Sequence, residues 1–152
     1  MAATTGLGVL LMGLMLVALA ASKTATGVLD TVSTGASGAA SVLTELLAEA
    51  IATAEGFYQS GSLAQRQQNP GNLTDSSGTI RTFATLADGW SALYTQIDAM
   101  LSNQSAKYNS GMSLSQIGDI YANHDPNWSK NVSAYIGVSP DTTLDELQAM
   151  YS

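Results

Sequence analysis

Hydrophobic residues divide the chain into three stretches of different character, and the first is the most apolar. Residues 7–21 read LGVLLMGLMLVALAA, and no charged side chain precedes Lys23. With its uncharged flanks this stretch reaches roughly 20 residues, the length of a helix that crosses a bilayer. A cleaved signal peptide is the alternative, because residues 18–20 resemble a cleavage site. Residues 1–5 lack the basic side chains that begin such a peptide, so we favour a retained transmembrane anchor over residues 1–22.

The second stretch, residues 23–40, consists of small and polar residues and contains three glycines. Glycine weakens a helix, so this composition favours a flexible linker. The alternative is a close contact between two anchors through small residues such as Ala36 and Ala40.

The third stretch, residues 41–152, has the hydrophobic spacing of a helical domain. Its first helix is predicted over Val42 to Ala54, where the inward positions are Val42, Leu43, Leu46, Leu47 and Ile51, and Gly56 ends the pattern. Residues 57–72 lack clear periodicity. Residues 73–84 are typical of a short β-hairpin with Ser77-Gly78 near its tip.

Four further helices are predicted from their capping residues. One runs from about Leu86 to Leu101 behind Thr85 and Asp88, and another begins after Ser113 with Gln116. The last two begin at Asp125-Pro126, ending at Gly137, and at Thr143 with Glu146. The inward positions expected on these helices are Trp90, Leu93, Tyr94, Ile97, Met100, Leu101, Leu114, Ile117, Ile120, Tyr121, Trp128, Val132, Tyr135 and Ile136. The fold class is therefore mainly α with one small β element.

The composition of the chain limits the kinds of site and partner that it can have. The formal net charge is −7 and no basic run occurs, which argues against nucleic acid binding because phosphates are neutralised by clustered Lys and Arg. There is no cysteine, which excludes thiolate sites, and His124 is the only histidine, so histidine-rich metal sites and Ser/His/Asp triads have little to draw on. Carboxylate chemistry remains, and nothing in the sequence predicts a cofactor or a metal site.

One carboxylate has an unusual position. Leu43, Leu47, Ile51 and Glu55 are spaced four apart, so they share one face of the first predicted helix. Glu55 therefore follows a buried apolar stripe at the C-terminal end of that helix. Both an apolar surrounding and a helix C-terminus disfavour the ionised form, so its pKa is expected to rise, as a general acid requires. The alternative is a solvated carboxylate at a helix end.

The segment around Glu55 resembles a known family. Ala54-Glu55-Gly56-Phe57, followed by Arg66-Gln67-Gln68-Asn69-Pro70-Gly71-Asn72-Leu73, is similar to lysozyme-like and lytic transglycosylase domains, particularly those of phage virions. The family loop reads RNNNPGNL, so two Asn positions are Gln here. The later segments that extend the resemblance over about residues 41–150 are Phe83-Ala84-Thr85, Asp88-Gly89-Trp90, Ala92-Leu93, Ile120-Tyr121-Ala122, Trp128, Asn131-Val132 and Tyr135.

The resemblance implies an enzyme that cuts the bond between N-acetylmuramic acid and N-acetylglucosamine in peptidoglycan, with Glu55 as its acid. A muramidase of the inverting type needs a second carboxylate, for which Asp75 is the candidate, although a turn-forming Asp is the more common reading of its sequence context. A lytic transglycosylase needs none.

The same resemblance proposes four substrate-binding residues. Asn69 and Asn72 would bind N-acetyl groups, or simply form the turn around the adjacent Pro-Gly. Tyr121 would reach the scissile sugar, or serve as a core aromatic. Arg66 would pair with a carboxylate of the muramyl peptide, or brace the loop. Trp128 would stack on sugar rings or lie in the core, whereas Trp90 is expected in the core.

Three functions remain open. The first is a wall-cleaving enzyme anchored in a bilayer through residues 6–22, in a phage virion or a bacterial envelope, where other virion proteins are possible partners. The second is a structural virion or membrane protein whose lysozyme-like domain binds glycan without cutting it. The third is a self-associating membrane protein. The first two predict that Glu55 lines an open groove, and the third predicts that Glu55 is buried or paired and that no groove exists.

Overall fold

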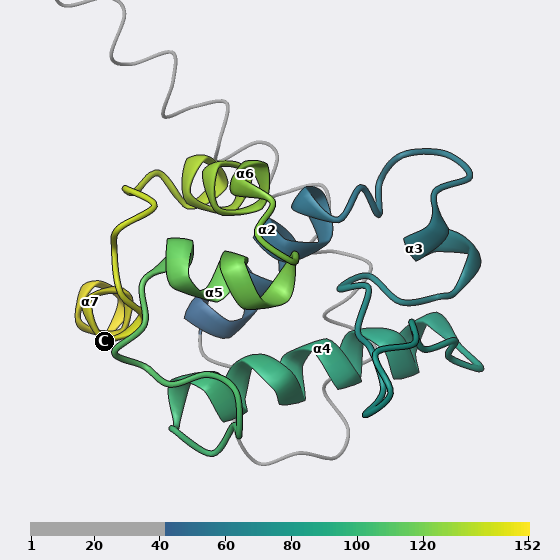
Figure 1. Ribbon diagram of the computed structural model, residues 1–152, viewed down its shortest axis with the longest axis horizontal. Helices are drawn as coiled ribbons and strands as arrows, with labels where there is room; N and C mark the ends of the chain where they lie inside the picture. The colour runs from purple at the N-terminus through teal and green to yellow at the C-terminus, as the bar shows by residue number, and fades with distance from the viewer. Residues whose placement is uncertain (1–41) are drawn as a thin grey trace, which may run out of the picture. The chain divides into compact units, whose positions relative to one another are not determined.

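The protein is mainly helical over residues 42–152, the part of the chain that the computed structural model describes (Figure 1). This confirms the mainly α class. The helices of this part are α2 (Val42–Ala54), α3 (Leu63–Arg66), α4 (Leu86–Leu101), α5 (Leu114–Tyr121), α6 (Pro126–Ile136) and α7 (Leu144–Tyr151). The predicted anchor, residues 1–22, and the predicted linker, residues 23–40, lie outside it. Within residues 42–152 every helix is too short or too polar to cross a membrane.

The predicted helix starts are confirmed by their caps. Thr85, Ser113 and Thr143 each accept a hydrogen bond from the backbone three residues ahead, and the side chain at that third position bonds back. Such reciprocal pairs satisfy amide groups that the first helical turn leaves free. Asp125 caps α6 ahead of Pro126, and Gly137 ends this helix with φ +87°. A positive φ is easiest for glycine, so α6 stops where the sequence predicts.

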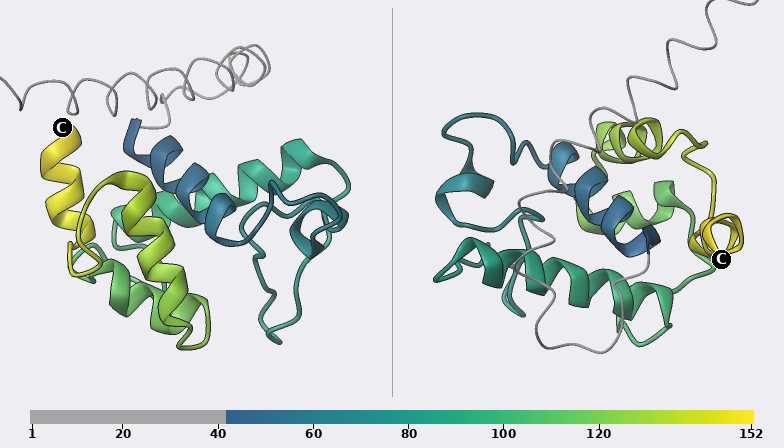
Figure 2. Two further views of the ribbon diagram at one scale, coloured as in Figure 1. Left: turned by 90° about the horizontal axis from the view of Figure 1, so that it is seen from above. Right: turned by 180° about the vertical axis from the view of Figure 1, so that it is seen from behind.

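Helix α2 lies at the centre of the core. It contacts α4 and α7 and packs most extensively on α6, which also contacts α5 (Figure 2). Its predicted stripe is confirmed, since Leu43, Leu47 and Ile51 are at most 3% exposed. The core cluster continues into α4, α5, α6 and α7 through Leu93, Ile97, Met100, Leu114, Ile117, Trp128, Val132, Leu144 and Leu147. Trp90 packs at the edge of this core and against Phe57, as expected.

Three apolar positions predicted to face inward are exposed instead. Val42 is 68% exposed because it begins α2, where the neighbouring helices do not cover it. Ile120 and Tyr135 are 43% and 46% exposed. In both helices the four-residue steps point inward, Ile117 to Tyr121 and Val132 to Ile136. Ile120 and Tyr135 stand one position before Tyr121 and Ile136, so they fall beside the buried face.

Residues 55–85 differ from the prediction in two ways. A short helix, α3, lies within the stretch 57–72, for which no element was predicted, and Ser62 caps it. The predicted hairpin over residues 73–84 is wrong in extent, because only one bridge forms, between Thr74 and Ile80. The segment has few apolar residues to cover two strands. Its turn is where Ser77-Gly78 predicted it, with Gly78 at φ +84°.

Side-chain hydrogen bonds hold this region together in place of strands. Asn69 is fully buried, and its Nδ2 donates to the carbonyls of Leu73 and Arg81, each at 2.9 Å. Its Oδ1 accepts from the Leu73 amide at 2.9 Å. Gln68 donates to the carbonyls of Phe83 and Ala84. These bonds fix the loop that ends at Asn72.

Candidate functional site

Glu55 is held at the end of α2 by two donors that come from distant parts of the chain. Asn72 donates through Nδ2 to Oε2 at 2.8 Å, and the indole Nε1 of Trp128 donates to Oε1 at 2.9 Å. Both bonds link residues far apart in sequence, 17 and 73 positions. The carboxylate is half-buried, and each of its oxygens has a partner. Its orientation is therefore fixed by the fold and not by solvent.

The two donors belong to one closed arrangement. The ring of Trp128 stacks on Tyr121, with centroids 5.0 Å apart. Tyr121 donates its hydroxyl to the carbonyl of Gly71 at 2.6 Å. Gly71 precedes Asn72, whose side chain donates to Glu55. A Cβ on Gly71 would lie 2.8 Å from the Tyr121 hydroxyl, so the close approach requires glycine. The circuit joins α2, the loop before the turn, the end of α5 and the start of α6.

Burial raises the pKa of the Glu55 carboxyl above its ordinary value of 4.5. The hydrogen bonds from Asn72 and Trp128 act in the opposite direction, because they stabilise the anion, and the charge of Asp125 adds a smaller upward effect. The direction predicted from the sequence is confirmed. The same environment raises the pKa of Tyr121, through burial and the nearby Glu55 charge, so Tyr121 remains a hydrogen-bond donor.

Glu55 lines an open cleft, here called the Glu55 cleft, with a volume of about 440 Å³. Its other walls include Asn72, Tyr121, Asp125 and Trp128. A groove at Glu55 is what the two glycan-binding functions predict, and the self-associating alternative predicts its absence. The pairing of Glu55 with Asn72 and Trp128 is, however, what that alternative predicts. A larger cleft of about 860 Å³ adjoins it, and Asn72, Thr74 and Tyr121 line both.

Asp75, the candidate second carboxylate, is used within its own turn. Its Oδ1 accepts hydrogen bonds from the amide and hydroxyl of Ser77 and from the amide of Thr79. These bonds lower the pKa of Asp75, which is fully exposed. Asp75 lines the larger cleft and not the Glu55 cleft. The turn-forming interpretation of its sequence context therefore agrees with its surroundings.

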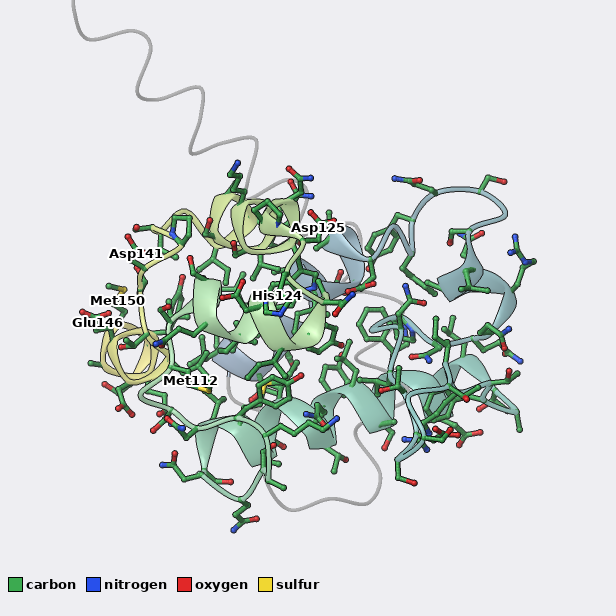
Figure 3. The ribbon with its side chains drawn as sticks, in the orientation of Figure 1. Met112, His124, Asp125, Asp141, Glu146 and Met150 are labelled. Atoms are coloured by element: carbon green, nitrogen blue, oxygen red, sulfur yellow. The ribbon has the colours of Figure 1, made fainter. Side chains whose placement is uncertain are left out.

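The acid that shares the cleft with Glu55 is Asp125, which sequence reasoning treated only as a cap. It does cap α6, since Oδ1 accepts from the amide of Asn127 at 2.9 Å. It also lines the Glu55 cleft. Figure 3 labels it beside His124 in the connection between α5 and α6. His124 is exposed and lies 3.7 Å from Asp119.

The four proposed substrate-binding residues separate into two groups. Asn72 and Tyr121 line both clefts. Asn69 is buried with both ends of its amide bonded to backbone, which is the turn-forming alternative. Arg66 donates to the carbonyl of Gly61 and lines neither cleft, which agrees with its alternative role as a brace.

Sequence reasoning missed the contact that fixes Glu55. Trp128 was expected to stack on a sugar or lie in the core, and it is buried, but its indole N–H is the donor to Glu55. Asn72 was expected to face a ligand, and its Nδ2 is also bonded to Glu55. Its Oδ1 is buried and accepts no hydrogen bond from residues 42–152. No local pattern carries these pairings, because the first depends on how α6 packs against α2 and the second on how the loop before the turn folds back.

The described residues contain no cluster of three or more side chains suited to a metal ion. No family model, curated protein or solved structure matches this chain.

Proposed function

We propose that this chain is a peptidoglycan-cleaving enzyme of the lysozyme and lytic transglycosylase type, with Glu55 as its general acid. The observation that carries the proposal is a carboxyl group of raised pKa that lines a cleft and is fixed by two neutral donors. A general acid must keep its proton near the working pH and present it in one direction. The apolar segment within residues 1–22 would anchor the enzyme in a phage virion or a bacterial envelope.

The arrangement favours a reaction with one carboxylate. Glu55 would give its proton to the glycosidic oxygen as the bond from that oxygen to the muramic C1 breaks. The resulting carboxylate would then take the proton of the muramic 6-hydroxyl, whose oxygen bonds to C1. The products are a 1,6-anhydro end and a free hydroxyl, and Glu55 is protonated again. These two reaction steps need neither water nor a second acid.

Hydrolysis would instead require a carboxylate that activates water. Asp75 is occupied by its turn, and Asp125 is partly occupied by the α6 cap. Asp125 is the better placed of the two, since it lines the Glu55 cleft. A muramidase would therefore depend on Asp125.

The two Gln residues that depart from the family loop do not disturb the site. Gln68 donates to the carbonyls of Phe83 and Ala84, and Gln67 accepts from the hydroxyl of Thr82. Both brace the loop against the segment after the turn. Asn72, which contacts Glu55, matches the family pattern.

A second candidate function is glycan binding without cleavage. It is favoured by the two hydrogen bonds to Glu55, because a carboxylate with both oxygens bonded is also typical of a structural role. The cleft would then hold sugar, and Glu55 would only orient Asn72 and Trp128.

Incubating the full chain with isolated peptidoglycan and reading soluble products by mass spectrometry separates these functions. We expect anhydro-muropeptides from the wild type and a loss of at least about a hundredfold in rate for Glu55→Gln, since general acid catalysis contributes that much. Glu45→Gln is the matched control, because Glu45 is an exposed carboxylate on the same helix. It should cut like the wild type.

Two other outcomes of this experiment would favour other functions. Reducing-end products would identify a muramidase, and Asp125→Asn should then lose activity while Asp75→Asn keeps it. No products from the wild type, together with retention on the glycan, would favour the binding function over the enzyme.

A further inference from the structure

Glu49, another glutamate of α2, lies among three tyrosines. Tyr58, in the segment just after α2, donates its hydroxyl to Oε2 of Glu49. Burial raises the pKa of Tyr94 on α4 and of Tyr135 on α6, and the charge of Glu49 raises both further. Burial and the bond to Glu49 raise the pKa of Tyr58, with smaller effects of Tyr94 and Tyr135. Because α2 contacts both α4 and α6 and such effects fall off with distance, three hydroxyls converge on one carboxylate. These four residues are called the Glu49 site.

The charge of Glu49 has no cationic partner within the described part of the chain. No Lys or Arg among residues 42–152 lies within ion-pair distance of its carboxylate. Its Oε1 accepts no hydrogen bond from these residues, and the hydroxyls of Tyr94 and Tyr135 form none with them either. Glu45, one turn earlier on α2, adds a negative charge that also reaches Tyr94. The Glu49 site therefore combines negative charge with three oxygen atoms that can still accept hydrogen bonds.

Two of the tyrosine rings are held in place by other aromatic rings. Tyr58 meets Phe57 edge to face, with centroids 5.2 Å apart, and Tyr94 stacks on Trp90 at 6.0 Å. Rings that are already ordered lower the entropic cost of binding a ligand. The site is nevertheless open to a partner, because Tyr58 is 50% and Tyr135 46% exposed.

The Glu49 site is separate from the clefts near Glu55. None of its four residues lines the Glu55 cleft or the larger cleft. Glu49 and Glu55 lie six positions apart on α2, so at 100° per residue they point in directions roughly 120° apart. A ligand at Glu49 therefore leaves the candidate reaction site free.

The open acceptors select the chemistry of the ligand. A primary ammonium group has three N–H donors, which match Oε1 of Glu49 and the hydroxyl oxygens of Tyr94 and Tyr135. The faces of tyrosine rings also attract cations. A guanidinium binds best through two parallel hydrogen bonds to a carboxylate, but one oxygen of Glu49 is already bonded to Tyr58. A quaternary ammonium has no N–H group, so it would leave the open acceptors without a donor.

A lysine side chain on a partner protein suits this setting. Its aliphatic stem can lie along an exposed tyrosine ring while the ammonium group reaches the carboxylate. Tyrosine is also enriched in protein interfaces, where one end of the ring is apolar and the other forms hydrogen bonds. We propose that the Glu49 site binds the primary ammonium group of a lysine side chain presented by a partner protein. This inference does not depend on the reaction proposed for Glu55.

The test follows every tyrosine ring of the full chain in one NMR spectrum. The chain has six tyrosines, and Tyr108, Tyr121 and Tyr151 lie outside the Glu49 site, so they serve as internal controls. The chain with isotope-labelled tyrosine rings is titrated with a capped glycine peptide that carries one central lysine. We expect the signals of the three site tyrosines to shift and those of the controls to stay. A peptide with norleucine, which keeps the stem without the charge, should bind at least about tenfold more weakly, the effect of one hydrogen bond to a charged group.

Variants assign the binding to its residues. Glu49→Gln should weaken binding of the lysine peptide at least about tenfold, because it removes the charge and keeps the length of the side chain. Tyr135→Phe keeps the ring and removes one acceptor, so it should weaken binding several-fold. Asp141→Asn is the control, since it removes the same charge from an exposed position between α6 and α7 and should bind like the wild type. Circular dichroism of each variant verifies that it is folded.

Several results would overturn the proposal. They are the absence of any shift, equal binding of the lysine and norleucine peptides, shifts spread over all six tyrosines, and a Glu49→Gln protein that binds like the wild type. Free butylamine distinguishes the source of the ammonium group. If it binds as tightly as the lysine peptide, the site holds small amines and the partner protein is refuted. Weaker binding of butylamine would support a lysine presented on a chain.

Discussion

Residues 55–85 and residues 86–152 reach their structures by different means. In the C-terminal part, α4, α5 and α7 each begin with a reciprocal cap between residues three apart. In residues 55–85 the regular structure is one four-residue helix and one bridge. Several bonds that fix this part connect residues far apart in sequence, such as Asn72 with Glu55, 17 positions away.

The difference shows where function can be placed. Caps that depend on neighbours in sequence mark where each helix begins, and packing of the helices in one core makes them a rigid frame. The loop also depends on the frame, because Glu55, Gly71 and Phe57 have partners on α6, α5 and α4. Its polar groups therefore converge on Glu55, in the part of the molecule with the least secondary structure.

The largest expected effect comes from a substitution that separates residues 55–85 from the helices around them. Gly89 on α4 lies so close to the loop that a Cβ would meet the carbonyl oxygen of Gln68 at 1.9 Å. Gly89→Ala should therefore destabilise the protein by about 3 kcal/mol or more, although alanine favours a helix by about 1 kcal/mol over glycine. Urea unfolding followed by circular dichroism measures this loss.

The control for this variant is Ser91→Ala, an exposed position in the same helix. It should change the free energy of unfolding by less than about 0.5 kcal/mol. A Gly89→Ala protein as stable as the wild type would mean that the loop does not press on α4.

The next effect compares the buried side-chain bonds of Asn69 with an exposed helix cap. Asn69→Ala leaves the carbonyls of Leu73 and Arg81 and the amide of Leu73 without their partner, in a buried place. We expect a loss of about 2–3 kcal/mol, because unsatisfied buried groups are costly. Thr143→Ala removes a local cap and should cost about 1 kcal/mol. Equal losses in urea unfolding would show that the two regions are held with similar strength.

The same contrast explains what the sequence predicts. Helix starts follow from pairs such as Thr85 with Asp88, which are readable three residues apart, and the position of α4 was predicted to the residue. The burial of Leu47 and Ile51 follows from spacing on one helix. The weaker predictions, the hairpin and the inward Ile120 and Tyr135, rest on apolar residues whose neighbours are set by packing.

The candidate site was predicted in part. Glu55 and the direction of its pKa follow from its place after an apolar stripe. The donors do not, since Trp128 is 73 positions away and reaches Glu55 only because α6 packs against α2. Asp125 was identified as a cap and not as the acid in the cleft, because a cap is local and the cleft is not.

The smallest expected effect is in how the free energy of unfolding depends on pH. It tests whether the helices control the protonation of Glu55. Because the pKa of Glu55 is raised on folding, the folded protein retains this proton above pH 4.5, where the unfolded chain releases it. Stability from this group is therefore highest below pH 4.5 and declines as pH rises through the folded pKa. Subtracting the unfolding free energies of Glu55→Gln from those of the wild type, across pH 4 to about pH 8, isolates this decline.

Trp128→Phe sharpens this measurement. It keeps a ring against Tyr121 but removes the indole donor to the Glu55 anion, so the pKa of Glu55 should rise further. The decline in stability should then extend to higher pH than in the wild type, whatever constant loss the smaller ring adds at every pH. The alkaline limb of the pH–rate profile should move in the same direction, because that limb reports loss of the acid's proton. A limb that stays in place while the unfolding curve moves would mean that a group other than Glu55 supplies the proton, and the frame would then hold a carboxylate that does no catalysis.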